Sequence, residues 1–182
     1  MRAGGKDAMT EIEVKIRIGD PKAAREKLLG LGAVVARDRH LETNVLFDFE
    51  SGALRAGRRA LRLRTTGKRA TLTFKGEPRK SRSFKVREEF ETQVRNPREL
   101  RKILKALGLR ETFAYGKHRT VLRKNRLTIC IDETSAGNFL ELEGERHEIT
   151  RFARALKFGR ADFITRDYIE LIGKRGEPGG PD

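Results

Sequence analysis

Charged and aliphatic side chains alternate along residues 10–18, TEIEVKIRI, in a pattern suited to metal and phosphate chemistry. Successive side chains of a strand point to opposite faces, so Glu11, Glu13, Lys15 and Arg17 share one face. Carboxylates two residues apart project together, and clustered oxygen ligands of this kind suit Mg²⁺ or Mn²⁺ rather than zinc. The neighbouring cations suit phosphate oxygens.

The same design recurs on other segments with a period of two. Their charged faces hold Arg62 and Arg64, Lys75, Lys85, Arg87, Glu89 and Glu91, Lys117 and Arg119, and Glu141, Glu143 and Glu145. A single strand of this kind usually has its polar face in water. Here, however, Thr, Ser and Gln are scarce on these faces, and like charges come in pairs, with paired Glu on three strands and paired Arg or Lys on others, which favours a closed barrel with the charges inside.

Charges enclosed in a barrel need partners, because an unpaired buried charge is costly. The carboxylates would be neutralised by a divalent ion, and the cations by a polyphosphate. A metal-bridged triphosphate would neutralise both sets together. The sequence therefore predicts that the glutamates bind a metal ion and that the cations bind phosphate.

Two helices that would position these strands carry the same signals. Asp20-Pro21 predicts a helix over 21–31, and Asn96-Pro97 predicts one that ends at Gly108. The pairs Asp20 and Asn96, Gly32 and Gly108, and Glu13 and Glu89 are each 76 positions apart. The chain is therefore expected to contain two related halves.

The remaining pattern predicts about eight strands. Besides 10–18, period-two segments cover 45–49, 60–65, 71–76, 83–94, 115–123, 126–132 and 139–145, and a third helix is expected over 149–158. Most connections are too short for parallel crossovers, so we expect an α+β protein with a mainly antiparallel sheet.

The composition limits the classes of partner that this chain is expected to bind. It has 182 residues, 37% of them apolar, and a net charge of +15, which attracts polyanions. No apolar run is long enough for a membrane span. The absence of tryptophan disfavours stacking on single-stranded nucleic acid. The only cysteine, Cys130, lies in an apolar run and is expected to be buried.

The two ends of the chain are polar, and neither has the apolar region of a secretory signal. We expect a disordered leader over 1–8, a domain over 9–173, a disordered tail over 174–182, and a cytoplasmic protein.

Glu11-x-Glu13-x-Lys15 resembles the ExExK signature of the CYTH superfamily, the triphosphate tunnel metalloenzymes. This superfamily includes class IV adenylyl cyclases, thiamine triphosphatases and inorganic triphosphatases. Further motifs follow in family order: Asn44 to Phe47-Asp48, Leu61–Arg64, Thr73–Gly76, Arg87-x-Glu89-x-Glu91, Lys117-x-Arg119, Ile131-Asp132, Gly137–Glu143 and Asp167-Tyr168. The resemblance spans about residues 10–172 and implies an eight-stranded antiparallel β-barrel, the triphosphate tunnel, with helices packed outside.

The resemblance also implies roles for individual residues. The metal ligands would be Glu11, Glu13, Glu141 and Glu143, with Glu89, Glu91 and Asp132 in the same acidic cluster or just behind it. The triphosphate would be held by Lys15, Arg62, Arg64, Lys75, Arg87, Lys117 and Arg119, of which Lys75, Lys117 and Arg119 are assigned to catalysis. The expected cofactor is Mg²⁺ or Mn²⁺.

The sequence departs from the family pattern at two places. Some members carry a tyrosine just before the aspartate of the Phe47-Asp48 motif, whereas Leu46 and Phe47 have no hydroxyl. Asp167 replaces the usual serine before Tyr168.

These observations favour hydrolysis of an inorganic or organic triphosphate such as tripolyphosphate, ATP or thiamine triphosphate. The first alternative is a class IV adenylyl cyclase that converts ATP to cyclic AMP and pyrophosphate. The second is a non-catalytic binder of polyphosphate or phosphorylated ends. A basic duplex-binding protein is disfavoured, and a homodimer is left open.

Overall fold

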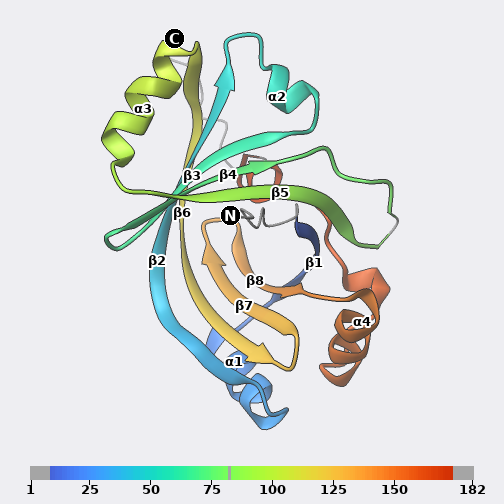
Figure 1. Cartoon of the computed structure of the whole chain (residues 1–182). Coiled ribbons are helices and arrows are strands. Elements are labelled where there is room, and N and C mark those ends of the chain that lie inside the picture. The colour runs from blue at the N-terminus through green and yellow to red at the C-terminus, as the bar shows by residue number, and fades with distance from the viewer. Residues whose placement is uncertain (1–8, 82, 174–182) are drawn as a thin grey trace, which may run out of the picture. The chain divides into compact units, whose positions relative to one another are not determined.

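The computed structural model describes residues 9–81 and 83–173, so the expected leader and tail lie outside the described residues. Figure 1 shows the elements in chain order. They are β1 (Met9–Ile18), α1 (Pro21–Gly30), β2 (Val34–Phe49), α2 (Ala53–Ala56), β3 (Ala60–Thr66), β4 (Arg69–Lys75), β5 (Lys85–Val94), α3 (Pro97–Ala106), β6 (Leu109–Lys124), β7 (Leu127–Thr134), β8 (Gly137–Glu143), α4 (Arg146–Ala155), a 3₁₀ turn (Arg160–Asp162) and α5 (Tyr168–Gly173).

The strands hydrogen-bond in the closed order β1-β5-β4-β3-β2-β6-β7-β8. The chain is therefore an eight-stranded antiparallel β-barrel with additional helices, which confirms the predicted fold class. No helix in the described part of the chain has the length and apolar character needed to cross a membrane.

The predicted repeat is visible in the elements themselves. β1 and β5 have 10 residues each, α1 and α3 have 10 each, and β2 and β6 have 16 each. Asp20 accepts a hydrogen bond from the backbone N–H of Lys22, and Asn96 accepts one from that of Glu99. Gly32 and Gly108 follow the helices at φ +80° and +84°, the left-handed conformation in which glycine has no steric cost.

The third helix was predicted with the wrong boundaries. α4 begins three residues before the expected 149 and ends three residues before the expected 158. Its first residue follows Glu145, whose side chain makes no capping hydrogen bond, and Lys157 adopts φ +68° just beyond its end. Neither boundary carries the proline or glycine signal that marks α1 and α3.

The chain divides into two compact units. In its described residues, unit 1 comprises 9–12 and 41–116, and unit 2 comprises 13–40 and 117–173. In unit 1, the strands β2 to β5 have one apolar face, where Phe47, Leu63 and Ala70 pack with Leu104 of α3 in a buried cluster. Their opposite face carries the charged side chains described below.

Unit 2 has the same division between faces. In the β1–β8 pair, Val14 lies opposite Leu142 and Ile16 opposite Leu140, and all four side chains are buried. α1 contacts β7, and α4 buries Ile149, Phe152 and Ala153. Alternation along each strand therefore leaves the opposite face to charged residues.

Candidate functional site

Lys15 lies at the centre of an acidic patch in unit 2. In the register of β1 and β8 it lies opposite Glu141, and Glu13 lies opposite Glu143, so all four side chains share one face. The Lys15 Nζ donates to Glu13 Oε1 at 2.9 Å and lies 3.2 Å from Glu141 Oε2. Burial lowers the pKa of Lys15, but the carboxylates of Glu13 and Glu141 more than offset that effect and raise it above its ordinary value.

Asp132, fully buried on β7, holds two cations of β6. Arg119 donates to it through Nε to Oδ1 at 2.6 Å and through Nη2 to Oδ2 at 2.6 Å, while Lys117 Nζ donates to Oδ2 at 2.9 Å. Burial raises the pKa of Asp132, but Arg119 and Lys117 outweigh it and hold the pKa below its usual range. Asp132 therefore stays ionised and orients both cations.

Arg119 connects these two groups of charges. Its Nη2 also donates to Glu141 Oε1 at 2.8 Å. Glu13, Lys15, Glu141, Arg119, Asp132 and Lys117 consequently form one continuous buried network in unit 2, of alternating sign. We call these six residues the Lys15–Asp132 network.

Tyr168, at the start of α5, completes this network. Its hydroxyl donates to Asp132 Oδ2 at 2.6 Å, and its ring lies 5.1 Å from Lys15 Nζ and 4.7 Å from Lys117 Nζ. The preceding segment is fixed to β1 by two backbone hydrogen bonds between Lys15 and Ile164. Burial, and then the carboxylates of Asp132 and Glu141, raise the pKa of Tyr168, which keeps the phenol protonated.

Unit 1 carries a second group, centred on Lys75 at the end of β4. Its Nζ donates to Glu11 Oε2 at 3.1 Å and to Glu89, which lies opposite it on β5. Arg87, whose side chain is only 2% exposed, has its Nε 3.9 Å from Glu89 Oε1. These four residues make the Lys75 group.

The remaining charged residues predicted for the site lie on the same face of unit 1. Arg64 contacts Asn44 Oδ1 at 3.2 Å and Glu42 Oε2 at 3.4 Å. Arg62 approaches Thr73 Oγ1 at 3.4 Å, and Thr73 donates to Glu91 Oε2 at 2.9 Å. The buried Glu42 was not predicted, although it precedes Asn44 by two residues and the alternation of β2 could have indicated it.

Two motif residues have structural roles. Asp48 accepts hydrogen bonds from the backbone N–H groups of Phe49, Leu54 and Arg55, which fixes the start of α2. Although burial raises the pKa of Asp48, these bonds lower it overall. Phe47 belongs to the apolar cluster of unit 1, so no hydroxyl is supplied at that position.

Five of the carboxylates predicted to bind metal contact cations in this structure, namely Glu11, Glu13, Glu89, Asp132 and Glu141. Within residues 9–81 and 83–173, no group of three or more His, Cys, Asp or Glu side chains is arranged as a ready-made metal site. Glu13 and Glu141 nevertheless share one positive charge, the Lys15 ammonium. Their oxygen-only donor set is the kind that suits Mg²⁺ or Mn²⁺.

Comparison with known proteins places this architecture in a family. The sequence-family model of the CYTH domain matches residues 9–166. The chain belongs to the CYTH domain family. The family resemblance predicted from the motifs is thereby confirmed.

Three proteins similar to this chain match it over nearly its whole length. "Putative adenylate cyclase MJ0240" of Methanocaldococcus jannaschii is 30% identical over 176 residues, covering 91% of this chain and 99% of that protein. The PH1012 protein of Pyrococcus horikoshii OT3 is similar in structure, with a TM-score of 0.76 at 26% identity, covering 88% of this chain and 98% of that one. HpAC1 from Hippeastrum, described as having a dominant triphosphatase activity, has a TM-score of 0.68 at 19% identity and covers 93% of this chain and 98% of its own.

Proposed function

We propose that this CYTH protein is a divalent-metal-dependent enzyme that hydrolyses a triphosphate-containing substrate. The observation that carries the proposal is the Lys15–Asp132 network, in which Lys15, Lys117 and Arg119 are buried with three carboxylates. A buried ion network is often no more stabilising than apolar side chains of similar volume. The presence of six buried charged side chains is therefore better explained by a charged ligand than by stability.

Glu13 and Glu141 would hold the metal ion in unit 2, with Glu143 on the same face. The support is that both carboxylates already approach a single positive charge at Lys15 Nζ. A bound divalent ion would polarise phosphoryl oxygens and neutralise charge that develops during transfer.

Lys117 and Arg119 would bind phosphate oxygens. Asp132 fixes both cations, and the Tyr168 hydroxyl fixes Asp132 in turn. Such preorganised cations need no reorganisation when negative charge develops, which is the main electrostatic contribution to phosphoryl transfer. Lys75 and Arg87 of the Lys75 group carry the same chemistry in unit 1.

In the proposed reaction, water attacks the terminal phosphorus and the bond to the bridging oxygen breaks, which releases orthophosphate. A class IV adenylyl cyclase is the second candidate, because the curated relative at 30% identity carries an adenylate cyclase name. In that reaction the ribose 3′-hydroxyl attacks the α-phosphorus of ATP, and pyrophosphate leaves.

The experiment is product analysis with tripolyphosphate, ATP and thiamine triphosphate, each with Mg²⁺, Mn²⁺ or a chelator. Orthophosphate formed only with metal supports hydrolysis, whereas cyclic AMP with pyrophosphate supports the cyclase. Binding of these compounds without any product would instead indicate a polyphosphate binder and would overturn the enzyme proposal.

A further inference from the structure

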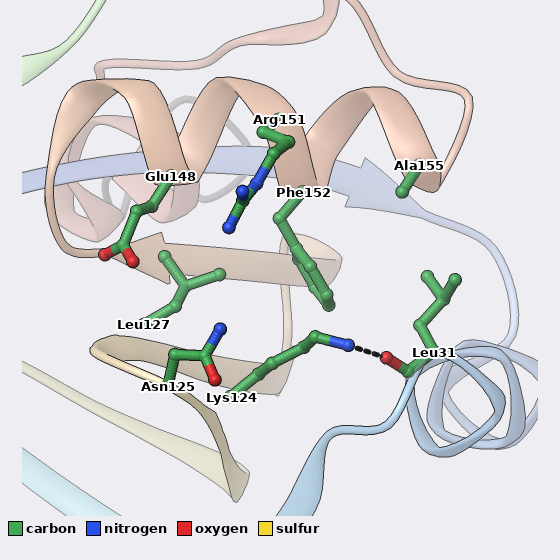
Figure 2. Close-up of a pocket in the computed structure, with 8 residues that line it drawn as sticks. All are labelled: Leu31, Lys124, Asn125, Leu127, Glu148, Arg151, Phe152 and Ala155. Atoms are coloured by element: carbon green, nitrogen blue, oxygen red, sulfur yellow. Dashed lines mark hydrogen bonds between the residues drawn. The ribbon is translucent and has the colours of Figure 1, made fainter.

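A pocket of about 220 Å³ lies in unit 2, lined by residues of α4, the β6–β7 turn and the end of α1. Figure 2 shows its walls. The lining residues are Leu31, Lys124, Asn125, Leu127, Glu148, Arg151, Phe152 and Ala155. None of them belongs to the Lys15–Asp132 network, so the pocket is separate from the residues of the proposed reaction.

Glu148 supplies an unsatisfied acceptor. Its Oε2 atom is completely buried and has no hydrogen-bond partner. Leaving a buried acceptor unpaired carries its full desolvation cost, and more for a charged group. The Glu148 side chain as a whole is only partly buried, so its carboxylate can accept a hydrogen bond from a donor outside the chain, and a cationic donor makes a stronger bond than water does.

Arg151, one turn further along α4, supplies a cation. Residues three apart on a helix are neighbours and can pair when their charges are opposite. Among the contacts of the described residues, however, neither Glu148 nor Arg151 takes part in an ion pair. Figure 2 shows both side chains extending from α4 towards the turn that carries Asn125 and Leu127.

The other charge of the pocket is already engaged. Lys124 Nζ donates to the carbonyl oxygen of Leu31, the residue that follows α1 and caps its C-terminus. A cation at this position complements the negative end of the helix dipole. The pocket thus offers one carboxylate, one guanidinium and an apolar wall formed by the buried Leu127 and Phe152.

We propose that this pocket binds a free α-amino acid with an apolar side chain. Its ammonium would donate to Glu148, its carboxylate would accept from Arg151, and its side chain would pack against Leu127 and Phe152. The size agrees, because pockets for drug-sized ligands have volumes of roughly 300–1,000 Å³ and this pocket is smaller. A nucleotide would need more space.

The test is calorimetric titration of the full chain with L-leucine. N-acetyl-L-leucine, which lacks the ammonium, and L-leucinamide, which lacks the carboxylate, serve as matched ligands. We expect L-leucine alone to bind, and expect Glu148→Gln and Arg151→Gln each to weaken it about tenfold or more, since each removes a charge-assisted hydrogen bond. Arg154→Gln, on α4 but outside the pocket lining, should bind as the wild type does.

Glu148→Gln should fold about as stably as the wild type, because Glu148 is partly exposed and its buried Oε2 has no hydrogen-bond partner to lose. Turnover of triphosphate is an independent check of folding for both variants, since neither residue is in the proposed reaction site. Absence of L-leucine binding to the wild type up to about 10 mM, a tenfold excess over a Kd of about 1 mM, would overturn the proposal. So would equal binding of either matched ligand, or unchanged binding to Glu148→Gln and Arg151→Gln.

Discussion

Tyr168 is the residue whose role was hardest to foresee from sequence. It lies 36 positions from Asp132, yet its hydroxyl donates to that carboxylate while its ring faces two ammonium groups. One side chain thus restrains the acid that orients Lys117 and Arg119, and its ring also faces the ammonium groups of Lys15 and Lys117. We regard Tyr168 as a positioning residue for the network.

Tyr168→Phe should lower the free energy of unfolding by about 1.5–3 kcal/mol, because it removes a hydrogen bond to a buried charge and keeps the ring. Tyr168→Leu should lower the free energy of unfolding further, since it also removes the cation–π contacts. Urea denaturation measures both. In the Asp132→Asn background the cost of Tyr168→Phe should shrink; an undiminished cost there would show that the hydroxyl does not act through Asp132.

Cys130 is buried, as the sequence predicted, and burial raises its pKa to about 12. Because the thiolate is the reactive form and the raised pKa keeps the thiol protonated at pH 8, folded protein should resist thiol reagents at that pH. The reaction should become rapid once denaturant unfolds the chain. A stoichiometric reaction of the native protein within the mixing time would contradict this account of its environment.

At the scale of elements, the two capped helices have the same local origin. Asp20 and Asn96 each satisfy a backbone N–H at the first turn of a ten-residue helix. Asp20→Ala and Asn96→Ala should therefore each lower the free energy of unfolding by about 1 kcal/mol in chemical denaturation.

Glu145→Ala is the control for the caps, because Glu145 occupies the equivalent position of α4 without a capping hydrogen bond. Its surface ion pairs with Arg126 and His147 are exposed and should contribute less than about 1 kcal/mol. Equal losses in all three variants would mean that the caps of α1 and α3 are not what stabilises them.

The elements that sequence could predict are those with local signals. The proline, capping and glycine signals predicted the boundaries of α1 and α3 to within two residues. α4 lacks those signals, and each of its predicted boundaries was wrong by three residues. β2 and β6 were predicted only over 45–49 and 115–123, but each has 16 residues. Most side chains in the first part of β2 are exposed, so its alternation of apolar and polar residues is weak there.

The sequence predicted which charged residues share a strand face, but it did not predict which acid pairs with which base. Period-two alternation placed Lys15, Lys117, Arg119 and Glu141 on charged faces, because that period is set by the strand itself. Which acid meets which base depends on strand register, and a change of one residue would reverse every face. The pairing of Lys15 with Glu141, and of Arg119 with Asp132, therefore required the structure.

At the scale of the whole molecule, the charge of +15 and the buried networks are distinct features. The six members of the Lys15–Asp132 network comprise three acids and three bases, which cancel formally. The surplus charge must therefore lie elsewhere in the chain. It would attract a polyanion over a distance, and added salt should weaken that attraction.

We expect that a ligand must replace internal ion pairs before the Lys15–Asp132 network can act on a substrate. A divalent ion would take the carboxylates of Glu13 and Glu141, and phosphate oxygens would take the cations those carboxylates now contact. Metal and triphosphate should consequently each raise the affinity for the other, and linkage requires that both effects be the same factor, which titration of one ligand with and without the other measures.

The most direct test compares the metal-dependent turnover of triphosphate by the wild type with that of Glu13→Gln. We predict product formation by the wild type and a loss of about a hundredfold or more in Glu13→Gln, in the range that removal of one preorganised electrostatic group costs. Glu145→Gln, an exposed glutamate outside the network, should retain the wild-type rate. An unchanged rate in Glu13→Gln with every triphosphate that the wild type cleaves would contradict the central claim.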